Sequence, residues 1–102
     1  MHASAIPISQ ELLAGFCRRH GVLKLALFGS VLTERFSDAS DVDVLVEFDP
    51  RAKAGYLRMA AMERELSGIL GGRKVDLRTP NELSVYFRDE VLRTAAVQYA
   101  AE

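Results

Sequence analysis

The chain has 102 residues, of which 49% are hydrophobic and 26% charged, and its formal net charge at neutral pH is −1. These values are typical of one globular domain with a modest core, so we expect residues 1–102 to form a single domain without a second substrate-binding lobe. The small net charge argues against strong binding to nucleic acid. No apolar run approaches the roughly 20 residues that cross a bilayer, and we expect no membrane partner.

The cysteine content bears on the compartment. The only cysteine, Cys17, cannot form an internal disulfide, and the chain does not open with a signal-peptide pattern. Both observations favour a reducing cytoplasm as the location. We expect Cys17 to behave as a small buried residue on the first helix.

The first predicted elements are a helix followed by a strand. Ser9 is a suitable N-cap for a helix that runs to about His20, and Gly21 is suited to the position that ends it. The segment from Val22 to Phe28 is almost entirely apolar. Such a segment is typical of a strand in the centre of a sheet that helices cover.

A polar connection leads to a second strand. Residues 31–40 form this connection, with one helical turn expected around Leu32 to Phe36. The second strand should run from about Val42 to Phe48, where Pro50 follows it. A second helix is then predicted over Ala54 to Leu70, since its apolar residues recur at helical spacing and Gly71-Gly72 follow.

The last third of the chain predicts one more strand and one more helix. The segment Lys74 to Arg78 reads as a short strand interrupted by Asp76. The sequence from Thr79 to Glu82 has the pattern of a capping box with proline at the first helical position. The helix that it opens should bury Leu83, Phe87 and Val91 and extend to about Thr94. Residues 95–100 could continue this helix or form an edge strand.

Four short features suggest chemistry. Gly29-Ser30 ends the first predicted strand, Asp41 and Asp43 lie at the start of the second, and Asp76 lies in the third. Residues two apart in a strand share a face, so Asp41 and Asp43 should point the same way. Neighbouring strands would bring all three carboxylates to one side of the sheet. Their mutual repulsion is relieved by a cation, and hard oxygen ligands suit Mg²⁺ or Mn²⁺.

These parts are the ones that phosphoryl or nucleotidyl transfer requires. A glycine allows a phosphate-bearing ligand to approach the backbone, where Ser30 and nearby N–H groups can hold it. A bound metal neutralises the charge that develops on the leaving pyrophosphate. Asp76 is the candidate for the general base or for the ligand of a second metal.

Together, Gly29-Ser30, ten intervening residues, Asp41-x-Asp43 and the downstream Asp76 resemble the signature of the DNA polymerase β-like nucleotidyltransferase superfamily. The phrasing LFGS…SDVDVLVEF is similar to its minimal stand-alone members. The resemblance implies an α/β (α+β) fold, a small mixed sheet of three to four strands flanked by about three helices. It also implies ATP as donor and Mg²⁺ (or Mn²⁺) as cofactor, with Gly29 and Ser30 at the nucleotide phosphates and Asp41, Asp43 and Asp76 at the metals.

The sequence departs from the superfamily in one place. Many relatives carry Ala-Arg-Gly soon after the Gly-Ser pair, whereas this chain has Val31-Leu32-Thr33-Glu34-Arg35. Arg35 is therefore the candidate to replace the usual arginine at the nucleotide.

Minimal members of the superfamily are typically encoded beside a HEPN-domain protein. The resemblance implies an antitoxin of the type VII kind, which transfers AMP to a tyrosine of a HEPN-domain ribonuclease toxin. The alternative is a non-catalytic antitoxin, or binding module, that neutralises its partner by direct complex formation. We also expect a homo- or hetero-oligomer, because so small a domain with this apolar content can leave a sheet edge or a helix face uncovered.

Overall fold

The computed structural model describes residues 6–33, 37, 40–52 and 54–101. A four-stranded sheet with the order β3–β2–β1–β4 organises the fold. Its strands are β1 (Val22–Phe28), β2 (Val42–Phe48), β3 (Val75–Arg78) and β4 (Ala96–Ala100). The central strand β1 is antiparallel to both β2 and β4, whereas β2 and β3 are parallel. The expected small mixed sheet is confirmed.

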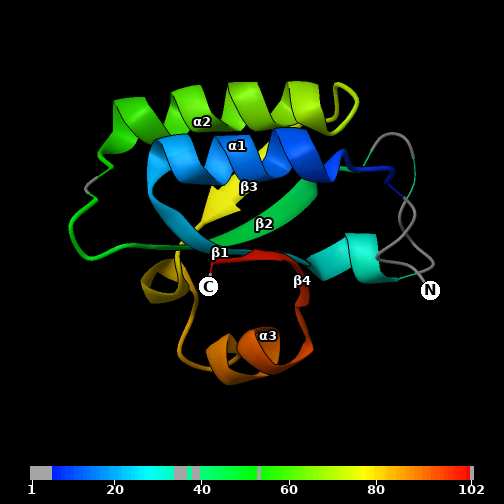
Figure 1. The fold of residues 1–102 in the computed structure, drawn as a ribbon. Coiled ribbons are helices and arrows are strands. Elements are labelled where there is room, and N and C mark those ends of the chain that lie inside the picture. The colour runs from blue at the N-terminus through cyan, green and yellow to red at the C-terminus, as the bar shows by residue number, and fades with distance from the viewer. Residues whose placement is uncertain (1–5, 34–36, 38–39, 53, 102) are drawn as a thin grey trace.

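Two long helices cover one face of this sheet. They are α1 (Gln10–His20) and α2 (Tyr56–Ile69), which lie side by side in Figure 1. The short helix α3 (Arg88–Thr94) and the 3-10 turn η3 (Pro80–Glu82) lie on the other side of the sheet (Figure 1). Within the described ranges, no helix has the length and apolar content needed to cross a membrane.

The first helix begins and ends where its sequence predicts. The Ser9 hydroxyl oxygen accepts a hydrogen bond from the N–H of Leu12 at 3.3 Å. At the other end, Gly21 adopts the left-handed conformation (φ 69°) and its N–H binds the carbonyl of Cys17. Cys17 is buried, as expected, and burial raises the pKa of its thiol to about 12.

The main core lies between the two long helices and the sheet. Alternate residues of the strands point into it, because side chains in a strand alternate between faces. The buried strand residues of this core are Val22, Leu25, Leu27, Val42, Val44, Val46, Val75 and Leu77. The intervening residues, among them Asp43 and Asp76, therefore face away from α1 and α2.

The prediction of a continuous helix from Thr79 to Thr94 is wrong. The capping box forms, since the Glu82 carboxylate accepts a hydrogen bond from the Thr79 N–H at 2.8 Å. However, the 3-10 turn that it opens ends at Glu82, and the next helix begins only at Arg88. Phe87, expected in the core, is 47% exposed.

Local polar groups explain this interruption. The Ser84 hydroxyl oxygen accepts a hydrogen bond from the Tyr86 N–H at 3.2 Å, which offers the backbone an alternative to helix. Arg88 donates to the carbonyl of Leu83 at 2.9 Å, so this carbonyl has a side-chain partner. Leu83 itself is extended (ψ 144°) and 7% exposed, which shows that its burial is obtained without a helix.

The bounds of three other elements differ from the prediction or decide between its alternatives. Residues 96–100 form the edge strand β4, the second of the two alternatives. Helix α2 is shorter than predicted at its start, because Gly55 is the N-cap. The turn after β1 is a 3-10 helix, η2 (Gly29–Leu32), which begins earlier than the turn expected around Leu32 to Phe36. Phe36 lies outside the described residues.

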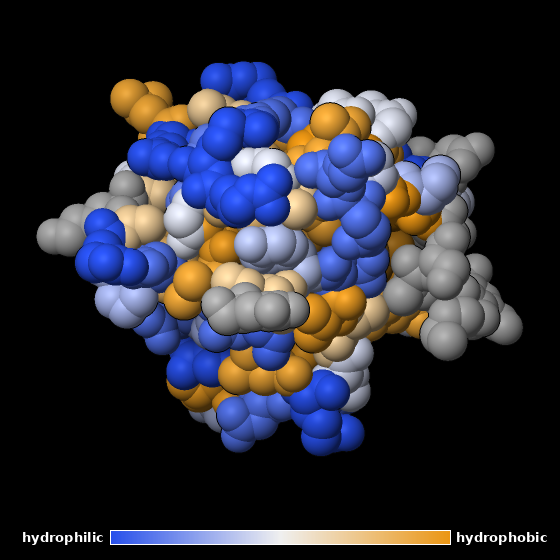
Figure 2. All heavy atoms as spheres, viewed as in Figure 1, coloured by the Kyte–Doolittle hydropathy of each residue, from blue (hydrophilic) through white to orange (hydrophobic). Residues whose placement is uncertain are grey.

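The exposed hydrophobic residues are unevenly distributed. Figure 2 shows hydrophobic residues interspersed with hydrophilic ones in the lower part of the view, around α3, and hydrophilic residues over much of α1. The large exposed hydrophobic side chains of this C-terminal region are Val85, Tyr86, Phe87, Leu92 and Val97. We call this set the C-terminal apolar surface.

Two glycines provide a matched test of the fold. Gly68 is exposed in α2 and a Cβ added there meets nothing within 4 Å, so Gly68→Ala should raise the free energy of unfolding by about 0.5–1 kcal/mol. Gly21 has a positive φ and an added Cβ would lie 2.7 Å from the Ala52 Cβ. Gly21→Ala should therefore lower the same free energy by about 1 kcal/mol or more. Urea denaturation measures the free energy of unfolding of both variants. Equal changes in the two variants would contradict the different backbone conformations assigned to Gly21 and Gly68.

Candidate functional site

The turn after β1 holds the Gly29-Ser30 pair in a fixed position. Val31, which belongs to this turn, is fully buried. The Ser30 carbonyl accepts hydrogen bonds from the backbone N–H and the hydroxyl of Thr33, at 2.9 and 2.8 Å. The 3-10 turn therefore presents the backbone of Gly29 and Ser30 at the end of the central strand.

Gly29 lies directly against the carboxylate of Asp43. Its φ is +78°, and a Cβ added to it would lie 2.3 Å from Oδ2 of Asp43. The contact follows from strand pairing, because Phe28 and Asp43 are Cα partners in the β1–β2 register. The glycine is thus needed both for its backbone conformation and for the space that the carboxylate occupies.

The pairing of β2 with β3 brings Asp43 beside Asp76. These two residues are Cα partners in the parallel register, so their side chains leave the same face of the sheet. Asp41 immediately precedes β2 and lies two residues before Asp43, which directs it toward the same face. The three carboxylates predicted from the sequence are therefore neighbours in space.

The electrostatics agree with this arrangement. Partial burial, and then the charges of Asp76 and Asp41, raise the pKa of the Asp43 carboxyl above its usual value, while Arg78 opposes the shift. Asp43 is half-buried, whereas the side chains of Asp41 and Asp76 are 51% and 39% exposed. Asp43 is thus the centre of a concentration of negative charge.

Two basic side chains lie beside the outer carboxylates. Nη2 of Arg78 lies 3.2 Å from Oδ2 of Asp76, and Nζ of Lys74 lies 3.9 Å from Oδ2 of Asp41. Neither residue is among those predicted to belong to the site. The alternation Lys74, Asp76, Arg78 on one face of a strand is the signal that could have found them, because residues two apart share a face.

The chemistry of these residues fits a divalent cation. The carboxylate oxygens of Asp41, Asp43 and Asp76 are the donors that Mg²⁺ and Mn²⁺ prefer. After partial burial, the charges of Asp76 and Asp41 contribute to the raised pKa of Asp43, and a cation would relieve that contribution. Within the described ranges, no three His, Cys, Asp or Glu side chains converge closely enough to hold one metal ion, so binding would require the carboxylates to move together. The candidate nucleotide residue Arg35 lies outside the described residues.

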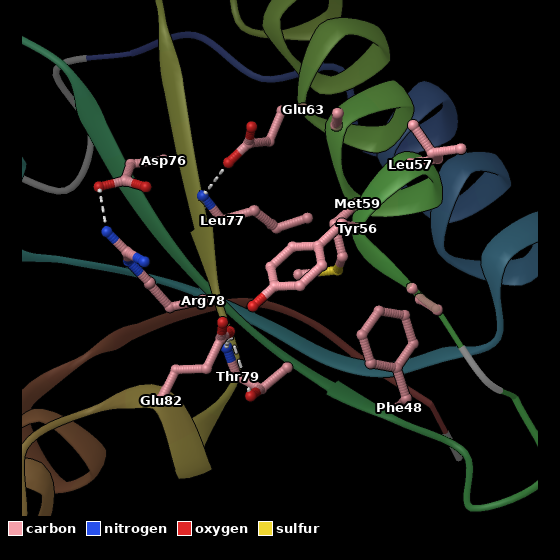
Figure 3. A pocket seen from close by; sticks show the side chains of 13 residues that line it. Phe48, Tyr56, Leu57, Met59, Glu63, Asp76, Leu77, Arg78, Thr79 and Glu82 are labelled. Atoms are coloured by element: carbon pink, nitrogen blue, oxygen red, sulfur yellow. Dashed lines mark hydrogen bonds and ion pairs between the residues drawn. The ribbon is translucent and has the colours of Figure 1, made fainter.

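A pocket of about 660 Å³ adjoins the third carboxylate at the free edge of β3. We call it the edge pocket. In Figure 3, Glu63 and Tyr56 project from α2 toward β3, and the Asp76–Arg78 pair lies on the other side of that strand. The lining residues include Phe48, Tyr56, Leu57, Met59, Glu63, Asp76, Arg78, Thr79 and Glu82. No sequence signal distinguishes Glu63, because it occupies an ordinary polar position on a helix.

A mixed sheet with paired carboxylates beside a Gly-Ser turn is the arrangement that the sequence led us to expect of a nucleotidyltransferase. A family profile described as "Nucleotidyltransferase domain" matches residues 9–97. The protein belongs to this nucleotidyltransferase domain family, and the expected fold and enzyme class are both confirmed.

Two relatives come from Methanocaldococcus jannaschii. The first, named "Putative protein adenylyltransferase MJ0435", is 32% identical over 77 residues, which cover 76% of this chain and 80% of the relative. The second, named "Putative protein adenylyltransferase MJ1217", is 35% identical over 66 residues, or 64% and 63% of the two chains.

Solved structures share the fold. One is described as "Structure of putative minimal nucleotidyltransferase" and is 35% identical, with a TM-score of 0.67 over 84% of this chain and 85% of that chain. Another, "Crystal structure of the toxin-antitoxin with AMP-PNP", has a TM-score of 0.70 at 16% identity and covers 93% of this chain and 76% of that chain. At 16% identity, this second similarity concerns the fold alone.

Neutralising Asp43 should stabilise the protein in the presence of EDTA. The raised pKa means that the folded protein holds the Asp43 proton more tightly than the unfolded chain does. The corresponding stability is present at low pH and is lost as the pH rises through the raised pKa. Asp43→Asn should therefore have a higher Tm than the wild type at about pH 7, with the difference disappearing near about pH 3.

Differential scanning calorimetry with and without Mg²⁺ measures this. Mg²⁺ should raise the Tm of the wild type and leave that of Asp43→Asn unchanged. Asp89→Asn, in the first turn of α3, is the control and should respond to Mg²⁺ as the wild type does. A Tm of Asp43→Asn below that of the wild type in EDTA would contradict the electrostatic assignment.

A methyl group at Gly29 should disable the site. Gly29→Ala must displace the Asp43 carboxylate or the turn, so nucleotidyl transfer should fall by at least about 100-fold. Gly68→Ala is the matched control, because its added methyl group has space, and its activity should be unchanged. Transfer at the wild-type rate by Gly29→Ala would show that the Gly29–Asp43 contact has no part in activity.

Proposed function

We propose that this protein is a magnesium-dependent protein adenylyltransferase. In this proposal it transfers AMP from ATP to a tyrosine hydroxyl of a HEPN-domain ribonuclease toxin and acts as its antitoxin. The observation that carries the proposal is the row formed by Gly29, directly after β1, with Asp43 on β2 and Asp76 on β3. Further support comes from the names of the two archaeal relatives and from the toxin–antitoxin structure that shares the fold.

The residues of the candidate site have different roles in the proposed reaction. Gly29 and Ser30 hold the β- and γ-phosphates through backbone N–H groups and the serine hydroxyl. Asp41 and Asp43, with Asp76, would hold Mg²⁺ (or Mn²⁺), which when bound would neutralise charge on the triphosphate. Lys74 and Arg78 lie beside Asp41 and Asp76 and would have to give up these ion pairs where the carboxylates hold a metal.

The proposed reaction is a nucleophilic displacement of pyrophosphate at the α-phosphorus of ATP. The acceptor oxygen forms a bond to the α-phosphorus while the bond from that phosphorus to the bridging oxygen of pyrophosphate breaks. The proton of the acceptor hydroxyl passes to the carboxylate of Asp76, the general base. The products are the adenylylated protein and pyrophosphate.

A second candidate function is supported by the C-terminal apolar surface. Its exposed side chains, among them Tyr86 at 95% and Val85 at 68%, are suited to contact with another protein. A non-catalytic antitoxin could occlude a toxin through this surface alone. The two functions are separated by variants of the carboxylates, which occlusion does not require.

The test combines labelling with protection of cells. Purified protein, α-labelled ATP and Mg²⁺ should label the product of an adjacent HEPN-like reading frame on tyrosine. Asp41→Ala/Asp43→Ala should reduce labelling by at least about 100-fold and abolish protection of cells from the toxin. Asp89→Ala serves as the control and should retain both properties. Protection by the double variant without labelling would establish the occlusion alternative.

A further inference from the structure

The candidate site and the edge pocket lie on one line across the sheet. Phe28 pairs with Asp43, and Asp43 pairs with Asp76, so Gly29 and the two carboxylates follow one another from β1 to β3. Neighbouring strands are about 4.8 Å apart. Beyond Asp76, at the free edge of β3, the line reaches the edge pocket.

This order determines the side from which an acceptor approaches. In phosphoryl transfer the attacking and leaving oxygens are roughly in line. Pyrophosphate held at Gly29-Ser30 would leave toward β1, so the acceptor must approach from the β3 side. The ribose oxygen is equatorial at the α-phosphorus, which directs the nucleoside away from this axis and leaves the β3 side to the acceptor.

The edge pocket has the chemistry of a site for a long cationic side chain. Phe48, Tyr56 and Met59 provide apolar walls, and Glu63 and Glu82 provide carboxylates. The pocket is also lined by the basic residue Arg78, whose charge is paired with Asp76. The aliphatic stem of a lysine or arginine can lie on such walls while its charged end meets the carboxylates, and an aromatic face adds to the attraction. The same carboxylates would repel a triphosphate.

Both glutamates retain capacity to accept further hydrogen bonds. Oε2 of Glu63 accepts from the Leu77 N–H at 2.8 Å, and Oε1 of Glu82 accepts from the Thr79 N–H at 2.8 Å. A carboxylate has two oxygens and about four lone-pair positions. Each glutamate can therefore bind a cationic side chain without giving up its backbone partner.

We propose that the edge pocket recognises a lysine or arginine adjacent to the acceptor hydroxyl. This inference rests on the proposed function. Adjacent residues of an extended segment point in opposite directions. A segment that crosses the edge of β3 thus places the hydroxyl beside Asp76 while its basic neighbour enters the edge pocket, which Glu63 of α2 and Glu82 of η3 both line. Glu63 and Glu82 determine specificity for the acceptor.

The first measurement is binding, which requires no transfer. The probes are two fluorescein-labelled peptides with one tyrosine each, flanked on both sides by lysine or by glutamine, and fluorescence anisotropy gives the Kd. The wild type should bind the lysine peptide about tenfold more tightly than the glutamine peptide. Added salt should reduce this preference. Equal binding of the two peptides, or no binding up to about 1 mM, would overturn the inference.

Isosteric variants test the two glutamates. Glutamine keeps the oxygen that accepts from the backbone, so Glu63→Gln/Glu82→Gln should keep its Tm and lose the preference for the lysine peptide. Tyr56→Ala removes a wall that is 92% exposed and should weaken binding of the lysine peptide without affecting the fold. Glu90→Gln, on α3, should bind as the wild type does. A lysine preference that survives the double substitution would also overturn the inference.

Transfer to the same peptides separates this inference from the proposed function. Labelling with α-labelled ATP should favour the lysine peptide about tenfold in kcat/KM, and the preference should disappear in Glu63→Gln/Glu82→Gln. Lysine-selective binding that depends on Glu63 and Glu82, with no transfer of AMP to peptide or toxin, would support the pocket and refute the adenylyltransferase. Transfer of AMP with the same kcat/KM to both peptides would support the adenylyltransferase and refute recognition of a basic residue by the edge pocket.

Discussion

The contact between Gly29 and the Asp43 carboxylate is the constraint on which the rest of the site depends. It requires a residue without a Cβ at a positive φ, directly after a buried strand. It also requires the β1–β2 register that pairs Phe28 with Asp43. A shift of one residue in that register would turn Asp43 into the core and expose the valines of β2. Burial of the apolar face of the sheet therefore also fixes the position of the carboxylate.

The sheet places like charges together, which costs stability. Asp43 is half-buried beside Asp41 and Asp76, and the raised pKa of its carboxyl records the cost of ionising it there. Lys74 and Arg78 offset part of this repulsion at the outer carboxylates. Such concentrations of unfavourable charge are common at functional sites, where a ligand that binds during activity relieves them.

Much of the fold could be predicted from the sequence because its signals are local. The ends of α1 follow from Ser9 and Gly21, and the apolar runs predict β1 and β2 with their observed bounds. The proximity of Asp43 and Asp76 follows once β2 and β3 are taken as neighbours. The prediction after Glu82 is wrong because Ser84 and Arg88 bind backbone groups there, and apolar spacing does not reveal such bonds. The edge pocket combines α2, β3 and η3, which only the tertiary structure brings together.

The hydrogen bond between Glu63 and the Leu77 N–H has a consequence for self-assembly. An outermost strand with unsatisfied backbone donors is a template on which another chain can add, and proteins commonly protect such strands with charged residues. Glu63 occupies an outward-facing donor of β3 and places a negative charge there. The Glu63 side chain thus disfavours pairing of β3 with the β3 edge of another copy, which carries the same negative charge. A positively charged chain can still approach this edge of the sheet.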